Sequence, residues 1–231
     1  MKKSIIKSGI SFFNGKWANY SKEEVSEYSF NIEGDKLIIK NNCSGLKIKK
    51  GDFSDVKITM KKQLGGTNEE ELKDALKSIY CEVKDGIIYV NPLSKNISSI
   101  NSTNIETIIM IPNNIKSLEI GSKIGNVLLD DNYDLVDINM NIGDLDYTGE
   151  LKQCYINSKI GDIRLNLNKI KDDYKYKIIK EIGNIKVTVP KGSKVNIIGV
   201  STNDIKGEIE INSDGAIIDI SKKISNVIIE N

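Results

Sequence analysis

The stretch KIGDIRL, residues 159–165, belongs to a repeated motif that decides the fold. KIGNVLL (123–129), NIGDLDY (141–147) and EIGNIKV (181–187) match it, and the weaker TNDIKG (202–207) and KISNVII (223–229) continue the series. The marker positions 125, 143, 161, 183, 203 and 225 are 18 to 22 residues apart. A period of about 20 residues, repeated six times, indicates units that cannot bury an apolar face alone and stack to share one core.

An alternating apolar run precedes each marker, as Val136, Ile138 and Met140 precede Gly143. Each unit is therefore interpreted as two strands joined by a tight corner, with Ile163 pointing inward and Arg164 outward. Stacked strands lie about 4.8 Å apart. The sequence predicts an all-β fold, a β-solenoid of the single-stranded β-helix type with about 20 residues per rung.

The corners combine a glycine with asparagine or aspartate. Glycine supplies the positive φ that a tight corner needs, and the neighbouring side chain can hydrogen-bond the turning backbone. The predicted structural corner residues are Gly125, Asn126, Gly143, Asp144, Gly161, Asp162, Gly183 and Asn184. If positive φ alone demands glycine, asparagine at position 161 should be tolerated no worse than alanine.

The rest of the chain divides into two further parts. Residues 28–115 form a strand-rich portion that runs on into the repeats at 116–231. Within it, a capping pair, Asn68 and Glu71, coincides with apolar residues at helical spacing: Leu72, Ala75, Leu76 and Ile79. Together they predict one short helix near 69–79.

Residues 1–27 form a separate N-terminal segment. Ile6, Ile10, Phe13 and Trp17 are spaced by 4, 3 and 4, which would give a small basic amphipathic helix. Such a helix could dock on a membrane surface or a protein partner. The favoured interpretation is a cap that shields the first rung.

Composition excludes several function classes. The net charge is +1, so no nucleic-acid partner is predicted, and the absence of histidine excludes imidazole catalysis. Cys43, Cys81 and Cys154 lack metal-site spacing and are interpreted as buried free thiols. We predict no catalytic residue, no cofactor, no metal and no transmembrane segment, and a cytoplasmic location, or a cell-surface one if an anchor lies outside this sequence.

Two sharper interpretations concern the corner carboxylates. Asp144 and Asp162 are adjacent acids in the corner series and could begin a metal track, but calcium-repeat glycines are absent. A carboxylate pair could also hydrolyse glycans. The structural interpretation, a ladder of turn-stabilising side chains, is favoured over both.

The ordered motifs resemble a known family. The IG(D/N)(I/L/V) corners, VTVPKGSKV (187–195), IIMIPNNIKSLEI (108–120) and the front strands from residue 28 look like the bacterial toastrack domains, also called putative adhesins. The resemblance implies a non-enzymatic binding or scaffold module of unknown ligand, connected with cell-envelope stress or adhesion, with a membrane-stress protein as partner. The alternative is a glycan-acting enzyme on a β-helix scaffold.

Overall fold

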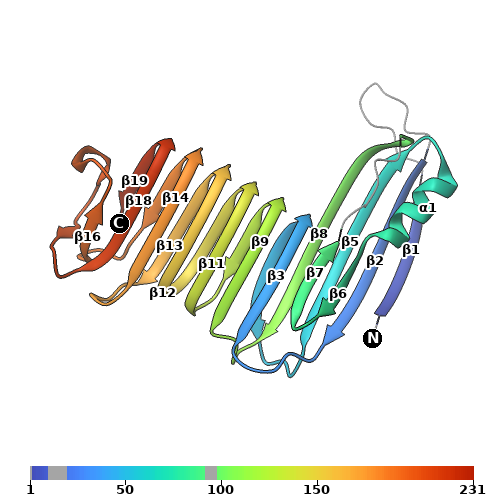
Figure 1. The fold of residues 1–231 in the computed structure, drawn as a ribbon, viewed down its shortest axis with the longest axis horizontal. Helices are drawn as coiled ribbons and strands as arrows, with labels where there is room; N and C mark the ends of the chain where they lie inside the picture. The colour runs from blue at the N-terminus through green and yellow to red at the C-terminus, as the bar shows by residue number, and fades with distance from the viewer. Residues whose placement is uncertain (1, 10–19, 92–97) are drawn as a thin grey trace.

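The computed structural model describes residues 2–9, 20–91 and 98–231, and the fold is all-β with a single α-helix in these ranges. The molecule is elongated, with strands stacked side by side along its length (Figure 1). No helix in the described ranges is long and apolar enough to cross a bilayer.

The strands form two groups, which we name layer A and layer B. Layer A contains β1 (Lys2–Gly9), β2 (Tyr20–Phe30), β4 (Gly45–Gly51), β5 (Val56–Gly66), β8 (Ile100–Pro112), β10 (Val127–Asp130), β13 (Ile163–Lys169), β15 (Ile185–Thr188) and β19 (Val227–Glu230). Layer B contains β3 (Lys36–Cys43), β6 (Tyr80–Lys84), β7 (Ile87–Asn91), β9 (Ser117–Ile124), β11 (Tyr133–Ile142), β14 (Lys175–Ile182), β16 (Lys194–Ile198), β17 (Glu210–Ile211) and β18 (Ala216–Ile224). The long strand β12 (Leu145–Ile160) pairs in layer A with its first half and in layer B with its second, so it joins the two.

Parallel register aligns equivalent residues of successive units. In layer A, Ile163 is paired with Leu145 on one side and Ile185 on the other. All three are essentially fully buried, whereas Arg164 is exposed. The predicted inward and outward positions at 163 and 164 are confirmed, because strand alternation sends every second side chain into the core between the layers.

The order of the last two units differs from the sequence prediction. Strand β18 lies between β14 and β16, and β19 pairs with β15 on one side and meets Ile205 through an isolated bridge on the other. The final unit is thus inserted before the unit that precedes it in the chain. Its apolar strands have neighbours on both sides. The stretch TNDIKG begins with a short 3-10 helix, η1 (Thr202–Asp204), and its Ile205 forms the bridge to β19.

A comparable insertion occurs nearer the N-terminus. Strands β3 and β4 form a unit that pairs with β9 and β10 on one side and with β7 and β8 on the other. In this unit Ser44 occupies the position of the marker glycine, since Cys43 is paired with Ile124 and Leu46 with Val127. The sequence motif therefore missed a unit that the stack includes.

The N-terminal end of layer A is antiparallel. Strands β1, β2, β5 and β8 pair in that order, and α1 (Glu69–Ser78) packs on β2 and β5. The predicted helix is confirmed: the Asn68 side chain accepts hydrogen bonds from the backbone N–H groups of Glu70 and Glu71, and Leu72, Ala75 and Leu76 are buried.

The predicted amphipathic helix at the N-terminus is wrong where the structure describes it. Residues 2–9, including Ile6, form strand β1, which is antiparallel to β2. Pairing with the long strand β2 provides hydrogen-bond partners for the backbone of β1. A short isolated helix would be only marginally stable in water. Ile10, Phe13 and Trp17 lie outside the described residues.

The corner glycines face a constraint stricter than positive φ. Gly161 has φ +126°, and a β-carbon there would lie 2.1 Å from the carbonyl oxygen of Gly143 in the preceding unit. The left-handed region that asparagine tolerates is centred near φ +57°. Both the angle and the backbone contact therefore disfavour any side chain at position 161, asparagine included.

Candidate functional site

The corner carboxylates are occupied by structural hydrogen bonds. Asp144 Oδ1 accepts from the Asp162 backbone N–H at 2.7 Å, and Asp162 Oδ1 accepts from the Asn184 backbone N–H at 2.9 Å. The guanidinium of Arg164 lies 3.2 Å from Asp162 Oδ2. The ladder holds each corner on the next, and it continues from Asn184 directly to Asn226 because the exchanged unit leaves Asp204 elsewhere.

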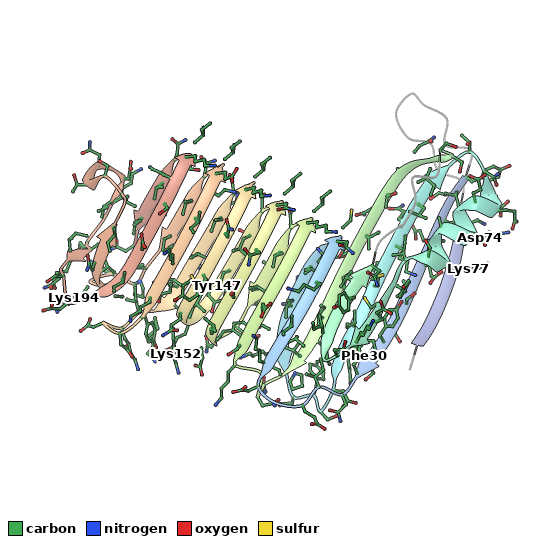
Figure 2. The ribbon with its side chains drawn as sticks, in the orientation of Figure 1. Phe30, Asp74, Lys77, Tyr147, Lys152 and Lys194 are labelled. Carbon is green, nitrogen blue, oxygen red and sulfur yellow. The ribbon has the colours of Figure 1, made fainter. Side chains whose placement is uncertain are left out.

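A second set of polar residues gathers on the opposite edge, where the chain passes from layer A to layer B. Figure 2 shows the labelled Lys152 on this lower edge. An open pocket of about 380 Å³ lies there, and we name it the lysine pocket. Its charged lining consists of Lys50, Lys116, Lys152, Lys169, Lys171, Asp134 and Glu150, with Asn132, Tyr133 and Tyr174 beside them.

Ion pairs engage only part of this positive charge. Lys152 Nζ lies 2.6 Å from Asp134 Oδ1, and Lys169 Nζ lies 3.1 Å from Glu150 Oε1. Lys116 and Lys171 form no ion pair within the described residues and are exposed. Among the lining residues, five lysines stand against two carboxylates, while Asp131 and Asp173 outside the lining also act on Lys50 and Lys152.

Lys50 lies deeper than the other lysines. Its ammonium is 4.2 Å from the centre of the Tyr133 ring and donates a hydrogen bond to the carbonyl oxygen of Asn132. Partial burial lowers the pKa of Lys50, while Asp131 and Asp134 act in the opposite direction. The ring face and the carbonyl hold this cation in place at the pocket wall.

Two tyrosines, Tyr133 and Tyr174, also line the pocket. The Tyr133 side chain is 2% exposed, and within the described part of the chain its hydroxyl has no hydrogen-bond partner. The Tyr174 hydroxyl donates to Glu150, which lowers the pKa of that carboxyl, and burial raises the pKa of Tyr174 to about 12. A buried polar group without a hydrogen-bond partner costs free energy in a native fold, and among the described residues the Tyr133 hydroxyl is such a group.

The sequence prediction missed this pocket because its residues come from four separate units. One signal was present: the spacing from Gly161 to Gly183 is 22 residues, against 18 for the two preceding intervals. The longer segment between β13 and β14 carries Lys171 and Tyr174, which form one wall of the pocket.

The three cysteines are free thiols. Cys81 and Cys154 are buried, as predicted, and burial raises the pKa of each to about 12. Cys43 is only half-buried, because it stands at an outward corner position beside Ile124. No group of three or more metal-binding side chains occurs among the residues that the structure describes.

No protein-family model matches this chain, and neither does a curated protein. Solved structures similar to it include a "putative cell adhesion protein" from Clostridium sporogenes, 18% identical with TM-score 0.39, covering 100% of this chain and 99% of that one. A "putative adhesin" from Bacteroides fragilis is 16% identical with TM-score 0.46, covering 90% and 96%. A "putative lipid binding protein" from Parabacteroides distasonis is 14% identical with TM-score 0.36, covering 90% and 96%.

Proposed function

We propose that this protein is a non-enzymatic binding module and that the lysine pocket recognises an anionic group, a carboxylate or phosphate carried by a small molecule or a glycan. The observation that carries the proposal is the positive charge of Lys116 and Lys171, which line an open pocket and form no ion pair within the described residues.

The pocket chemistry suits recognition rather than reaction. Ammonium groups attract an anion and donate hydrogen bonds to it. Lys152 pairs with Asp134 and Lys169 with Glu150, and Tyr174 donates a hydrogen bond to Glu150, so neither carboxylate is a free base. The pocket thus supplies charge and donors without an activated nucleophile.

The proposal also covers the type of fold and the biological role of the protein. We infer a β-solenoid of the toastrack type, supported by parallel columns such as Leu145, Ile163 and Ile185. A role in adhesion or envelope stress rests on the sequence resemblance alone.

The test is an NMR titration of the full chain with glucuronic acid and glucose 6-phosphate, with glucose as the neutral control. We expect the two anions to shift the amide signals of Lys116, Lys171 and Tyr133, and glucose to leave them unchanged. Raising the salt from about 50 to 300 mM should weaken binding, because the Debye length falls.

Variants separate the pocket from general surface charge. Lys116→Gln combined with Lys171→Gln should weaken binding of both anions about fivefold or more, since each lost exposed contact is worth up to roughly 1 kcal/mol. The matched control is Lys177→Gln, an exposed lysine on the outer face of β14. Equal shifts with glucose, or equal losses in the pocket and control variants, would contradict the proposal.

A further inference from the structure

A line of exposed isoleucines runs along the edge of the molecule opposite the lysine pocket. An isoleucine immediately precedes the marker position in five units, and the side chains are 45% to 71% exposed: Ile124, Ile142, Ile160, Ile182 and Ile224. The strands of layer B that carry them, β9, β11, β12, β14 and β18, all run toward this edge, which is the upper edge in Figure 1. We name this line the isoleucine ridge.

The ridge is continuous because the register is exact. Ile142 is paired with Ile124 and Ile160, and Ile182 with Ile160 and Ile224. With strands about 4.8 Å apart, the five side chains extend over about 19 Å. Single exposed apolar residues are ordinary, whereas a contiguous apolar line on a protruding edge marks an interaction surface.

Positive charge and amides lie on one flank of the ridge. An open groove of about 260 Å³ beside it is lined by Lys123, Lys159, Asn139, Asn141 and Asn157, among others. Lys123 and Lys159 form no ion pair within the described ranges, and Lys223 at the far end lies 3.5 Å from Glu181.

The other flank carries acids that are already engaged. Asp162 accepts backbone hydrogen bonds and pairs with Arg164, and Asp144 Oδ1 accepts from the Asp162 backbone N–H. Lys123 and Lys159, which form no ion pair in the described ranges, supply positive charge on the flank that faces the groove, and Asp144 keeps its negative charge on the other flank. This local balance is not visible in the net charge of +1 for the whole chain.

We propose that the isoleucine ridge inserts into the surface of an anionic lipid bilayer, with Lys123 and Lys159 contacting headgroup phosphates. A narrow convex apolar line flanked by cations matches the interfacial region of a membrane, where apolar side chains enter the acyl boundary and lysines remain at headgroup level. The inference is independent of the lysine pocket, which lies on the other edge.

A second copy of the chain fits the ridge less well. Stable interfaces bury roughly 800 Å² on each partner, which a single line of half-exposed isoleucines does not provide. Two copies meeting ridge to ridge about a two-fold axis through Ile160 would also bring the two copies of Lys159 together. Charge and area both favour the lipid surface.

Vesicle flotation of the full chain tests the proposal. We expect the protein to float with vesicles of POPC and POPG at 7:3 and to float at least tenfold less with pure POPC. Ile142→Ser combined with Ile160→Ser should reduce binding to the anionic vesicles tenfold or more. Ile211→Ser, which changes an isoleucine 54% exposed on the terminal strand β17, should leave binding unchanged.

Lysine variants test how much the positive charge contributes to vesicle binding. Lys123→Gln with Lys159→Gln should remove the preference for POPG, and Lys177→Gln should keep it. Absence of flotation in the parent protein, equal flotation with pure POPC, or unchanged flotation of the double isoleucine variant would overturn the proposal. A parent dimer in light scattering that the double isoleucine variant converts to monomer, without vesicle binding, would assign the ridge to self-association instead.

Discussion

The repeat region and the antiparallel N-terminal region hold their strands together by different interactions. In the repeat region, corners rest on each other through glycine contacts and side-chain-to-backbone hydrogen bonds such as Asp144 to Asp162. In the antiparallel N-terminal region, a helix and a buried ion pair take this role: Lys62 Nζ lies 2.8 Å from Glu24 Oε1, and both side chains are at most 3% exposed. The repeat region is therefore held by contacts to the backbone that recur from unit to unit. The N-terminal region is held by side-chain interactions that do not recur.

The largest effect expected in the repeat region is from Ile163→Asp. A carboxylate without a partner in the core costs several kcal/mol, comparable with the whole stability of a domain. We expect no cooperative melt near the parent temperature in circular dichroism. Arg164→Ser, one residue away and exposed, should melt within a few degrees of the parent. Equal behaviour of the two variants would contradict the strand register.

The corresponding break in the N-terminal region is Lys62→Met. It removes the buried ammonium that pairs with Glu24 and should lower the free energy of unfolding by about 3 to 5 kcal/mol. The neighbouring Lys61→Met removes an exposed pair with Glu106 and should cost less than about 1 kcal/mol. Urea denaturation measures both, and similar losses would show that burial does not distinguish the pairs.

A corner glycine should show a smaller but still clear effect. Gly161→Ala combines an unfavourable φ with a β-carbon contact to a carbonyl, so we expect a loss of about 2 to 4 kcal/mol. Gly34 also has positive φ, +91°, but a β-carbon there meets nothing within 4 Å, and Gly34→Ala should cost about 1 kcal/mol. Thermal melts that rank Gly34→Ala as the worse variant would refute the stacking contact.

The buried thiols predict a loss of stability at alkaline pH. The folded-state pKa of Cys81 and Cys154 is about 12, above the unfolded value near 8.5, so their contribution is complete at neutral pH. It is lost progressively as pH rises from about 9 toward 12, because the unfolded chain releases protons first. Melting temperatures across this range should fall. At pH 8, a thiol reagent should label Cys43 before the other two; prompt labelling of all three would contradict their burial.

Much of the fold was predictable because it follows from local patterns. Alternation placed Ile163 inside, and Asn68 with the apolar spacing after it predicted α1. The exchanged units were not predictable by the same means, since sequential units usually lie next to each other and only long-range pairing places β18 beside β14. The lysine pocket likewise depends on residues from separate units. Lys50 and Lys171 are far apart in the sequence and line the same pocket only when the units are stacked.

The measurement that tests the central claim most directly is a pair of cysteine cross-links in the Cys43→Ser background. Both proposed surfaces depend on the parallel register, and the isoleucine ridge also depends on the inserted final unit, which carries Ile224. Lys177 is paired directly with Asp219, and Asp219 with Ile198, so Lys177 and Ile198 are two strands apart. Lys177→Cys with Asp219→Cys should form a disulfide under mild oxidation, since neighbouring strands are within disulfide reach, while Lys177→Cys with Ile198→Cys should not. Cross-linking of the second pair and not the first would mean that the units stack in chain order, and the account would be wrong.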